Sequence, residues 1–202
     1  VPLRDAMVTG PEGLRVLTGS SGISSMLRLS RKRIDAFLSQ TKELENDTDV
    51  MIFDSASGAD PRVMSFLTFA DEAILVTTPD PAGIVDCYST AKVLFRYKKD
   101  AAVNVLVNQV QDEAQARKVF GTIQSAAQKF LKKQIGYLGY VRADSEAAEL
   151  TRARKLFTLA DRNLRASSDI NEVASTLMNG YSTTHEGTPD NTIILHSVRK
   201  VA

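Results

Sequence analysis

An aspartate at the end of an apolar run is the residue of this chain best suited to chemistry. The run is Val50-Met51-Ile52-Phe53, Asp54 follows it directly, and Gly58 comes four positions later. In an α/β protein such a run predicts a buried parallel strand whose C-terminal end lies where ligands bind. A carboxylate there can hold a hydrated Mg²⁺, and a glycine lets the backbone turn close to a phosphate. Taken alone, the segment fits equally well a core strand whose aspartate caps the next helix.

A rigid turn follows a second apolar run, at residues 73–77. Its sequence is Thr78-Pro79-Asp80-Pro81, in which the prolines fix the backbone and Asp80 can cap a helix that starts near Ala82. An ordinary connection between a strand and a helix explains this turn. Its expected place at the carboxyl edge of a sheet also puts it beside the loop of Asp54, where a ligand or a partner subunit would bind.

Two further strand ends carry polar groups. The run at 103–107 ends in Asn108, whose amide can pair with the edge of an adenine or simply turn the loop. The run at 135–140 continues through Val141 and Arg142, where the backbone can line a base pocket. Asp144 or Ser145 then reads as the N-cap of another helix. Each of these signals is weak alone.

The composition describes an ordinary soluble domain. The chain has 202 residues, of which 43% are hydrophobic and 24% charged, with a formal net charge of +1. A near-neutral total argues against a dedicated nucleic-acid binder, and no apolar run is long enough to span a membrane as a helix. The single cysteine, Cys87, excludes an internal disulfide and fits a reducing cytoplasm. Because Cys87 lies in a helical pattern, we expect it to be packed rather than nucleophilic.

Strands and helices alternate along the chain. Apolar runs predict strands at 15–18, 50–53, 73–77, 103–107 and 135–140. Helical spacing predicts helices at 23–38, 63–70, 84–95 and 119–130, and then at about 146–155 and 166–178. The order predicts an α/β fold with a mostly parallel sheet covered by helices on both faces.

The end of the chain differs in character from the rest. Residues 181–192 are polar and read as a flexible linker. Residues 193–201 combine Ile193, Leu195 and Val198 with Arg199 and Lys200, a pattern that suits a short amphipathic helix at a membrane surface. A disordered end or an added strand fits the same residues.

The order of these motifs resembles the MinD/ParA family of deviant P-loop ATPases. The motifs are strand-Asp-x-x-x-Gly, Thr-Thr-Pro-Asp-Pro, Val-Asn-Gln-Val and Leu-Gly-Tyr-Val-x-x-Asp. Within that family the chain looks like the flagellum-number regulators (FlhG, also called FleN or YlxH). The stretches Gly10-Pro11-Glu12-Gly13-Leu14-Arg15-Val16-Leu17 and Gly19-Ser20-Ser21-Gly22-Ile23 are typical of that branch. The resemblance runs from the first residues to about Met178.

The resemblance implies a role for each candidate residue. Asp54 would be the Walker B carboxylate that holds Mg²⁺ through its waters, and residues 54–58, with Gly58, would sense the γ-phosphate of ATP. Asn108 would contact the adenine, and the backbone at Val141 and Arg142 would form a wall of the base pocket. The turn at Pro79, Asp80 and Pro81 would contact a partner subunit.

The resemblance also implies a function. The intact protein would be a P-loop NTPase-like, Mg²⁺-dependent ATP hydrolase that regulates flagellar number or placement. It would form a homodimer with ATP, associate with the cytoplasmic face of the membrane and act on flagellar assembly or regulatory proteins. Residues 1–180 would be the C-terminal part of the ATPase domain, and residues 181–202 the linker and tail.

Two departures from the family pattern stand out. Family members commonly have proline where this chain has Arg142, which affects the expected pocket wall. No Gly-rich loop ending in Lys-Ser or Lys-Thr occurs in the sequence, and neither Gly10–Gly13 nor Gly19–Gly22 is followed by the lysine that would neutralise phosphate charge.

Two explanations fit the missing loop. Because the family's phosphate loop precedes the region where Val1 stands, we expect a truncation, with a degenerate non-hydrolysing relative as the alternative. The chain alone should then bind ATP weakly or not at all. Two rival functions stay open: a nucleotide-free regulatory binding module, and a ParA-like DNA-partitioning ATPase with salt-sensitive DNA binding.

Overall fold

The computed structural model describes residues 3–18, 30–45, 47–184 and 192–197. The chain divides into two compact units, and the boundary between them lies at Met51 and Ile52. The extent of the ATPase-domain segment that the sequence suggests, residues 1–180, stays a prediction. The candidate residues Asp54, Asn108 and Arg142 all lie in the second unit.

A small hairpin forms part of the first unit. Strands β1 (Val8–Thr9) and β2 (Arg15–Val16) pair in antiparallel fashion around the short helical turn η2 (Pro11–Gly13). The Gly10 amide donates to the Leu14 carbonyl at 2.7 Å, and Gly13 adopts a φ of 79°. Glycine reaches this left-handed region without steric cost. The Gly-Pro-Glu-Gly stretch is therefore a hairpin turn, and the strand expected at 15–18 belongs to this hairpin instead of the large sheet.

Two further helical segments belong to the described part of the first unit. They are η1 (Leu3–Ala6) and α2 (Arg31–Glu45). The buried residues of α2 are Ile34, Leu38, Thr41 and Leu44, three or four positions apart, as expected for one face of a helix. The helix predicted at 23–38 is thus described only from Arg31 onward, and Ile23, Met26 and Leu27 lie outside the described residues.

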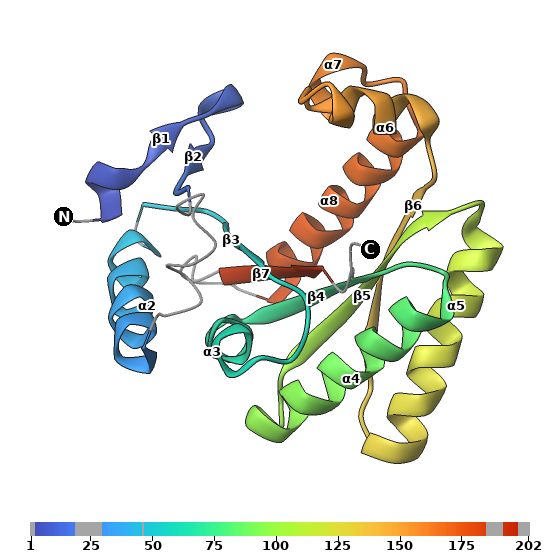
Figure 1. The fold of residues 1–202 in the computed structure, drawn as a ribbon, viewed down its shortest axis with the longest axis horizontal. Coiled ribbons are helices and arrows are strands. Elements are labelled where there is room, and N and C mark those ends of the chain that lie inside the picture. The colour runs from blue at the N-terminus through green and yellow to red at the C-terminus, as the bar shows by residue number, and fades with distance from the viewer. Residues whose placement is uncertain (1–2, 19–29, 46, 185–191, 198–202) are drawn as a thin grey trace. The chain divides into compact units, whose positions relative to one another are not determined.

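The second unit is built on a five-stranded sheet (Figure 1). Its strands are β3 (Met51–Ser55), β4 (Glu72–Thr77), β5 (Ala102–Val110), β6 (Gly136–Arg142) and β7 (Thr192–Ser197), in the order β3-β7-β4-β5-β6. β4 runs parallel to β5 and to β7, and β5 runs parallel to β6. The four strands expected at 50–53, 73–77, 103–107 and 135–140 are confirmed.

The fifth strand of the sheet comes from the other end of the sequence. β7 lies between β3 and β4, with Ile193 beside Glu72 and Ser197 beside Val76. Of the three conformations that the sequence allowed for the tail, residues 192–197 take that of an added strand, not of a helix. Residues 181–184 of the expected linker are helical, and residues 185–191 lie outside the described part of the chain.

Three helices and the strands form the main core. They are α3 (Pro61–Phe69), α4 (Pro81–Tyr97) and α5 (Glu113–Ala126), and α5 continues into the π-helical turn η3 (Ala127–Leu131). Every second residue of β5 reaches this core, as the alternation of side chains along a strand requires. The buried cluster includes Leu67, Cys87, Leu94, Ile123, Val103, Val105 and Val107.

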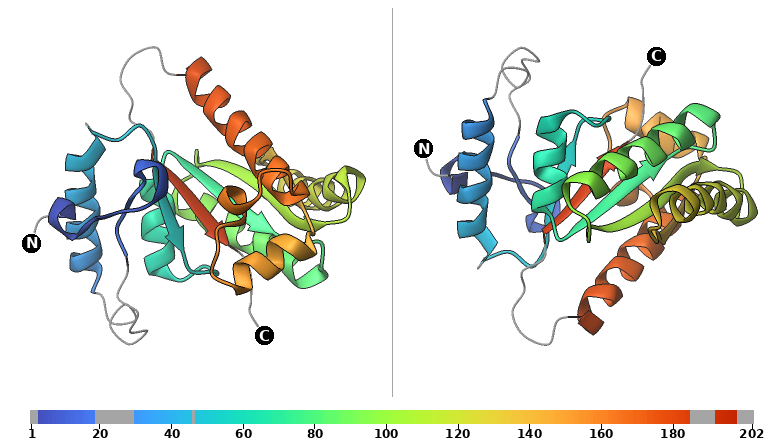
Figure 2. Two further views of the ribbon diagram at one scale, coloured as in Figure 1. Left: turned by 90° about the horizontal axis from the view of Figure 1, so that it is seen from above. Right: turned by 90° about the horizontal axis from the view of Figure 1, so that it is seen from below.

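The other face of the sheet carries α8 (Arg165–Thr184), preceded by α6 (Ser145–Arg152) and α7 (Phe157–Ala160) (Figure 2). Contact between α8 and β6 is close, because a Cβ built on Gly139 would lie 3.1 Å from Cγ2 of Val173. The expected helices on both faces are thus present. Within the described residues, every helix is too short or too polar to cross a bilayer.

Candidate functional site

The strands of the second unit end in the residues that the sequence singled out. Thr77 lies beside Val107, and Asn108 lies beside Val141 in the next strand. Parallel strands bring their C-terminal ends to one edge of a sheet. β3 is joined to β4 through α3, the kind of crossover that links parallel strands, so Asp54 belongs to the same edge.

Asn108 stands at an irregularity in β5. Its side-chain Oδ1 accepts a hydrogen bond from the Gln109 amide at 2.9 Å, and Gln109 has a φ of 59°, unusual for a residue with a side chain. The register with β6 shifts between Asn108 and Val110. Asn108 therefore does turn the loop, while its Nδ2 group makes no hydrogen bond with the described residues and is available to a ligand.

Arg142 is held by a carboxylate on the opposite side of the loop. Its backbone amide donates to Oδ2 of Asp169 at 2.8 Å, its Nε to the same oxygen at 2.9 Å and its Nη2 to Oδ1 at 2.7 Å. The side-chain hydrogen bonds that Arg142 donates to Asp169 raise the pKa of Arg142 above its ordinary value. The guanidinium is thus bound to α8, and Arg142 can contact a ligand through its backbone.

Asp169 is the partner that the sequence reading missed. Its side chain is only 3% exposed although it carries a charge. A signal was present, because Asp169 lies three residues after Ala166 and four before Val173, on the apolar face of the helix predicted at 166–178. A carboxylate on such a face needs a partner, since an unpaired buried charge is very unfavourable.

Asp144 connects the start of α6 to α8. It caps α6 by accepting from the amides of Glu146 at 3.0 Å and Ala147 at 3.1 Å, and it also accepts from Ala166 in α8 at 3.3 Å. The Ala147 amide is the largest cause that lowers the pKa of Asp144. The predicted cap is confirmed and falls on Asp144, not on Ser145.

Asp54 and Gly58 lie on the loop side of β3. Asp54 is exposed and makes no hydrogen bond or ion pair with the residues that the structure describes. Gly58 has a φ of 100° and open space around it. The described residues contain no group of three or more potential metal ligands. One carboxylate still fits Mg²⁺, which keeps most of its waters and takes its other ligands from phosphates.

The loop after Asp54 ends in a fixed helix start. Asp60 caps α3 by accepting from the Arg62 amide at 2.9 Å, and Nε of Arg62 donates to the same carboxylate at 2.7 Å. The Arg62 side chain is the main reason why the pKa of Asp60 falls from 3.8 to about 2. Residues 56–59 are therefore anchored by β3 on one side and by α3 on the other.

The turn at 78–81 is rigid, as its prolines predict. Asp80 caps α4 by accepting from the Gly83 amide at 2.9 Å, and it also accepts from the Thr78 hydroxyl, which lowers its pKa most. α4 begins at Pro81, one residue before the predicted start. Asp80 and Pro81 are exposed and Pro79 is half-buried, so the turn forms a surface at the candidate edge.

Sequence comparison finds relatives along most of the chain, although no family model matches. The antiactivator FleN of Pseudomonas aeruginosa is 27% identical over 172 residues, which are 85% of this chain and 61% of FleN. The flagellum site-determining protein YlxH of Helicobacter pylori is 25% identical over 173 residues, which are 85% of this chain and 58% of YlxH. The chain therefore spans about three fifths of the length of these relatives.

Structure comparison gives the fold. The cell division ATPase MinD of Pyrococcus furiosus superposes with a TM-score of 0.71, covering 89% of this chain and 71% of MinD at 16% identity. The resemblance inferred from the order of the motifs is thereby confirmed. The chain has the MinD-like P-loop NTPase fold, and its homologues include the antiactivator FleN and the flagellum site-determining protein YlxH.

Proposed function

We propose that this chain is part of a MinD-like ATPase that controls the number or placement of flagella through ATP-dependent dimerisation and membrane association. The observation that carries the proposal is that Asp54, Asn108 and Val141 lie near the C-terminal ends of their strands, with Asn108 beside Val141. The names of the relatives, an antiactivator and a flagellum site-determining protein, support the flagellar role. The ATPase with the same fold supports nucleotide binding.

Each residue has a distinct part in this proposal. Asp54 orients the waters of a bound Mg²⁺, and the backbone at Gly58 responds to the terminal phosphate. Asn108 donates from Nδ2 to the adenine, while the backbone at Val141 and Arg142 lines the base. ATP with Mg²⁺ supplies the transferable phosphoryl group, and catalysis in this class consists mainly of positioning and charge stabilisation.

The turn at Pro79, Asp80 and Pro81 is the proposed contact with a second subunit. ATP held between two subunits would favour the dimer, and hydrolysis would release it. The proposed place of action is the cytoplasm and the inner face of the membrane, with flagellar assembly or regulatory proteins as partners.

The test is nucleotide-dependent dimerisation of the complete gene product. Light scattering after gel filtration should give a dimer with ATP and Mg²⁺ and a monomer without them. Asp54→Ala should abolish the dimer, because the carboxylate that orients the metal is lost. Asp35→Ala, which removes an exposed carboxylate of α2 instead, is the matched control and should dimerise as the unmodified protein does.

The 202-residue chain is the second arm of the test. Its sequence contains no phosphate loop with a lysine, so calorimetry should give no micromolar binding of ATP with Mg²⁺. Micromolar binding would refute the proposal that this chain carries only part of the ATP site. If ATP neither binds to the complete gene product nor changes its oligomeric state, a nucleotide-free binding module is the better supported function. Salt-sensitive retention on nonspecific DNA would instead favour a ParA-like role.

A further inference from the structure

Two aromatic side chains stand exposed at the ends of neighbouring helices. Tyr97, the last residue of α4, is 63% exposed, and Phe130 in η3 is 65% exposed. They are the most exposed large apolar side chains among the described residues. Exposed rings in a group mark a contact surface more often than scattered apolar residues do.

Basic residues flank both rings along the chain. Residues 92–99 and 129–133 contain seven lysines and arginines and no acid. We call the exposed members of the two segments the lysine–aromatic patch: Lys92, Arg96, Tyr97, Lys99, Lys129, Phe130 and Lys132. Since the whole chain has a net charge of only +1, this positive charge is concentrated locally.

The remaining two cations hold the patch together. Nζ of Lys133 lies 3.8 Å from the Asp100 carboxylate and 5.6 Å from the ring centre of Phe95, so the segment after η3 is tied to the end of α4. Lys98 donates to the Ala70 carbonyl at 2.8 Å and ties the same end to α3. These contacts place the segment after η3 beside the end of α4.

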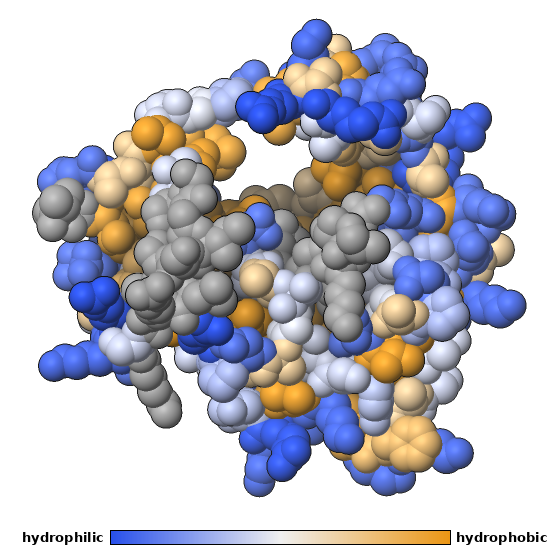
Figure 3. Space-filling model, viewed as in Figure 1, coloured by the Kyte–Doolittle hydropathy of each residue, from blue (hydrophilic) through white to orange (hydrophobic). Residues whose placement is uncertain are grey.

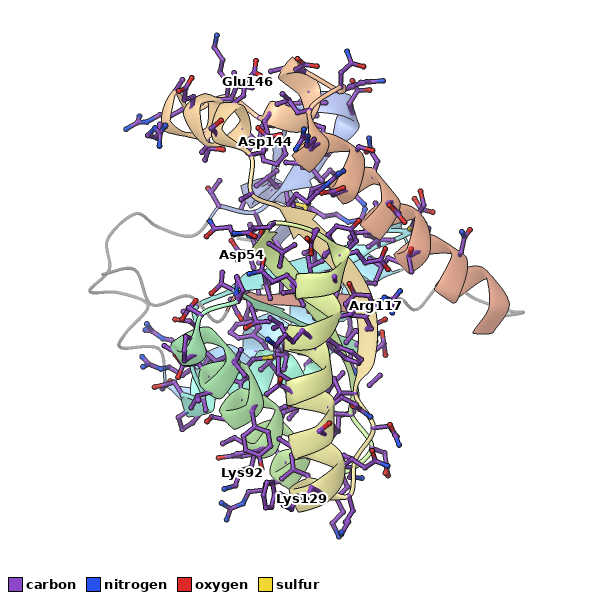
Figure 4. The ribbon with its side chains drawn as sticks, turned by 90° about the vertical axis from the view of Figure 1, so that its right-hand side faces the viewer. Asp54, Lys92, Arg117, Lys129, Asp144 and Glu146 are labelled. Atoms are coloured by element: carbon purple, nitrogen blue, oxygen red, sulfur yellow. The ribbon has the colours of Figure 1, made fainter. Side chains whose placement is uncertain are left out.

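The patch lies away from the candidate nucleotide site. α4 and α5 start at the carboxyl edge of the sheet and run back to the opposite edge, and Lys92 and Lys129 both lie toward that end of the unit (Figure 4). Asp144 and Glu146 lie at the other end of the same unit (Figure 4). In the space-filling view, apolar residues lie among hydrophilic ones over the ends of α4 and α5 (Figure 3).

A shallow hollow within the patch joins charge to apolar surface. Its volume is about 420 Å³, and Val93, Arg96 and Tyr97 line it. A guanidinium can bind a phosphate through two parallel hydrogen bonds, and a tyrosine ring has an apolar body with a polar tip. This combination suits a phosphate group that has hydrocarbon immediately beneath it.

We propose that the lysine–aromatic patch docks on the surface of an anionic lipid bilayer. The lysines would meet lipid phosphates, Arg96 and Tyr97 would sit at the level of the headgroups, and Phe130 would enter the hydrocarbon. Nucleic acid fits less well, because the cations surround the rings at one end of the unit and do not follow a groove along a strand. This inference rests on the membrane association in the proposed function and gives that association a surface.

Vesicle sedimentation without nucleotide tests the proposal on the 202-residue chain. We expect binding to vesicles of phosphatidylglycerol and phosphatidylcholine, none to phosphatidylcholine alone, and loss of binding at high salt. Each cation near an anionic surface contributes roughly fivefold to partitioning, so Lys92→Ala/Arg96→Ala/Lys99→Ala should bind about 100-fold more weakly. Tyr97→Ser/Phe130→Ser should also weaken binding, through the lost apolar contact.

A matched control separates the patch from total charge. Arg152→Ala/Arg154→Ala/Lys155→Ala removes the same charge from exposed residues at the α6 end and should bind like the unmodified chain. Circular dichroism and melting curves establish that each variant folds. Because nucleotide is absent, failure of the ATP site leaves this experiment unaffected.

Three results would overturn the proposal. The first is no binding to anionic vesicles at low salt. The second is equal binding by the patch variants and the unmodified chain, which would move the contact elsewhere, such as the tail at 193–201. The third is that the chain binds a fluorescent oligonucleotide but not the vesicles, and that the patch substitutions abolish the oligonucleotide binding. That result would make the patch a nucleic-acid surface.

Discussion

Arg142 and Asp169 are joined by three hydrogen bonds, two from the guanidinium and one from the backbone amide. They connect the end of β6, where a nucleotide base would lie, to the first turns of α8. The pair explains how the end of β6 accommodates an arginine beside the candidate base site. The long side chain turns away to α8 and is neutralised there.

Breaking this pair from one side should be costly. Arg142→Met leaves the buried Asp169 carboxylate without its charged partner, so the free energy of unfolding should fall by about 2–4 kcal/mol. The lower part of this range takes account of the 32% exposure of Arg142, which lets water replace some of the loss. Denaturant titration measures the change.

A double variant distinguishes the pair from general damage. Arg142→Met/Asp169→Leu removes both charges and should be more stable than Arg142→Met alone. Glu113→Gln, which removes one charge of the exposed pair with Arg117, should change the stability by no more than about 0.5 kcal/mol. A double variant as unstable as the sum of its single changes would argue against the pairing.

Acid unfolding should depend on Asp60. Arg62 holds the pKa of this carboxyl at about 2 in the folded chain, below its ordinary value of 3.8. A lowered pKa means that Asp60 stabilises the fold above about pH 4 and that this contribution is lost as the pH falls toward 2. Asp60→Asn keeps an oxygen for the Arg62 amide but cannot titrate, so stability measured against pH should fall less steeply in this window.

The control for this experiment is Asp100→Asn, at a side chain that is fully exposed. Its stability should fall between about pH 4 and pH 2 as steeply as that of the unmodified chain. If the stability of Asp60→Asn falls just as steeply, the bond from Arg62 does not stabilise the folded state in solution.

Gly83 should tolerate no side chain. A Cβ at this position would lie 2.7 Å from Oγ1 of Thr78 and 3.2 Å from Oδ2 of Asp80, so the cap of α4 would have to move. Gly83→Ala should lower the melting temperature through a loss of about 1–3 kcal/mol. Adding Thr78→Ala removes the closest atom and should recover part of the loss.

A second helical glycine provides the contrast. Gly121 in α5 has open space where a Cβ would lie, so Gly121→Ala should raise stability by about 0.5–1 kcal/mol. Equal effects of the two substitutions would show that the turn at 78–83 is less tightly packed than described.

Cys87 should be unreactive until the core opens. It is fully buried in α4, and burial raises the pKa of its thiol to about 12. The thiolate is the reactive form, so a thiol reagent at pH 8 should label unfolded chains and leave folded ones unlabelled. Labelling measured along a denaturant series should follow the unfolding curve, and rapid labelling of the native chain would contradict the packing of α4.

Local patterns predicted the parts of the fold that depend on local chemistry. The sequence correctly predicted strands β4, β5 and β6 and the helix caps Asp80 and Asp144. Burial and capping both require particular residue types at neighbouring positions, so they can be recognised in the sequence. The register that sets Asn108 beside Val141 also follows once the strands are parallel neighbours.

Pairings between segments that are distant in the sequence could not be predicted in this way. Val16 looks like a sheet residue, yet it pairs with Val8 in a hairpin, because an apolar run shows that a strand forms and not which strand it meets. The choice of Asp169 as partner for Arg142 depends on how α8 crosses β6, which periodicity does not encode.

The place of β7 has a consequence for the position of Asp54. Among the described strands, β3 neighbours β7 and not β4, so the strand that carries Asp54 meets the rest of the sheet through residues from the other end of the sequence. A change that displaces residues 192–197 would leave the edges of β3 and β4 unpaired and facing each other. The spacing between Asp54 and Asn108 is thus set by a segment that contributes neither residue.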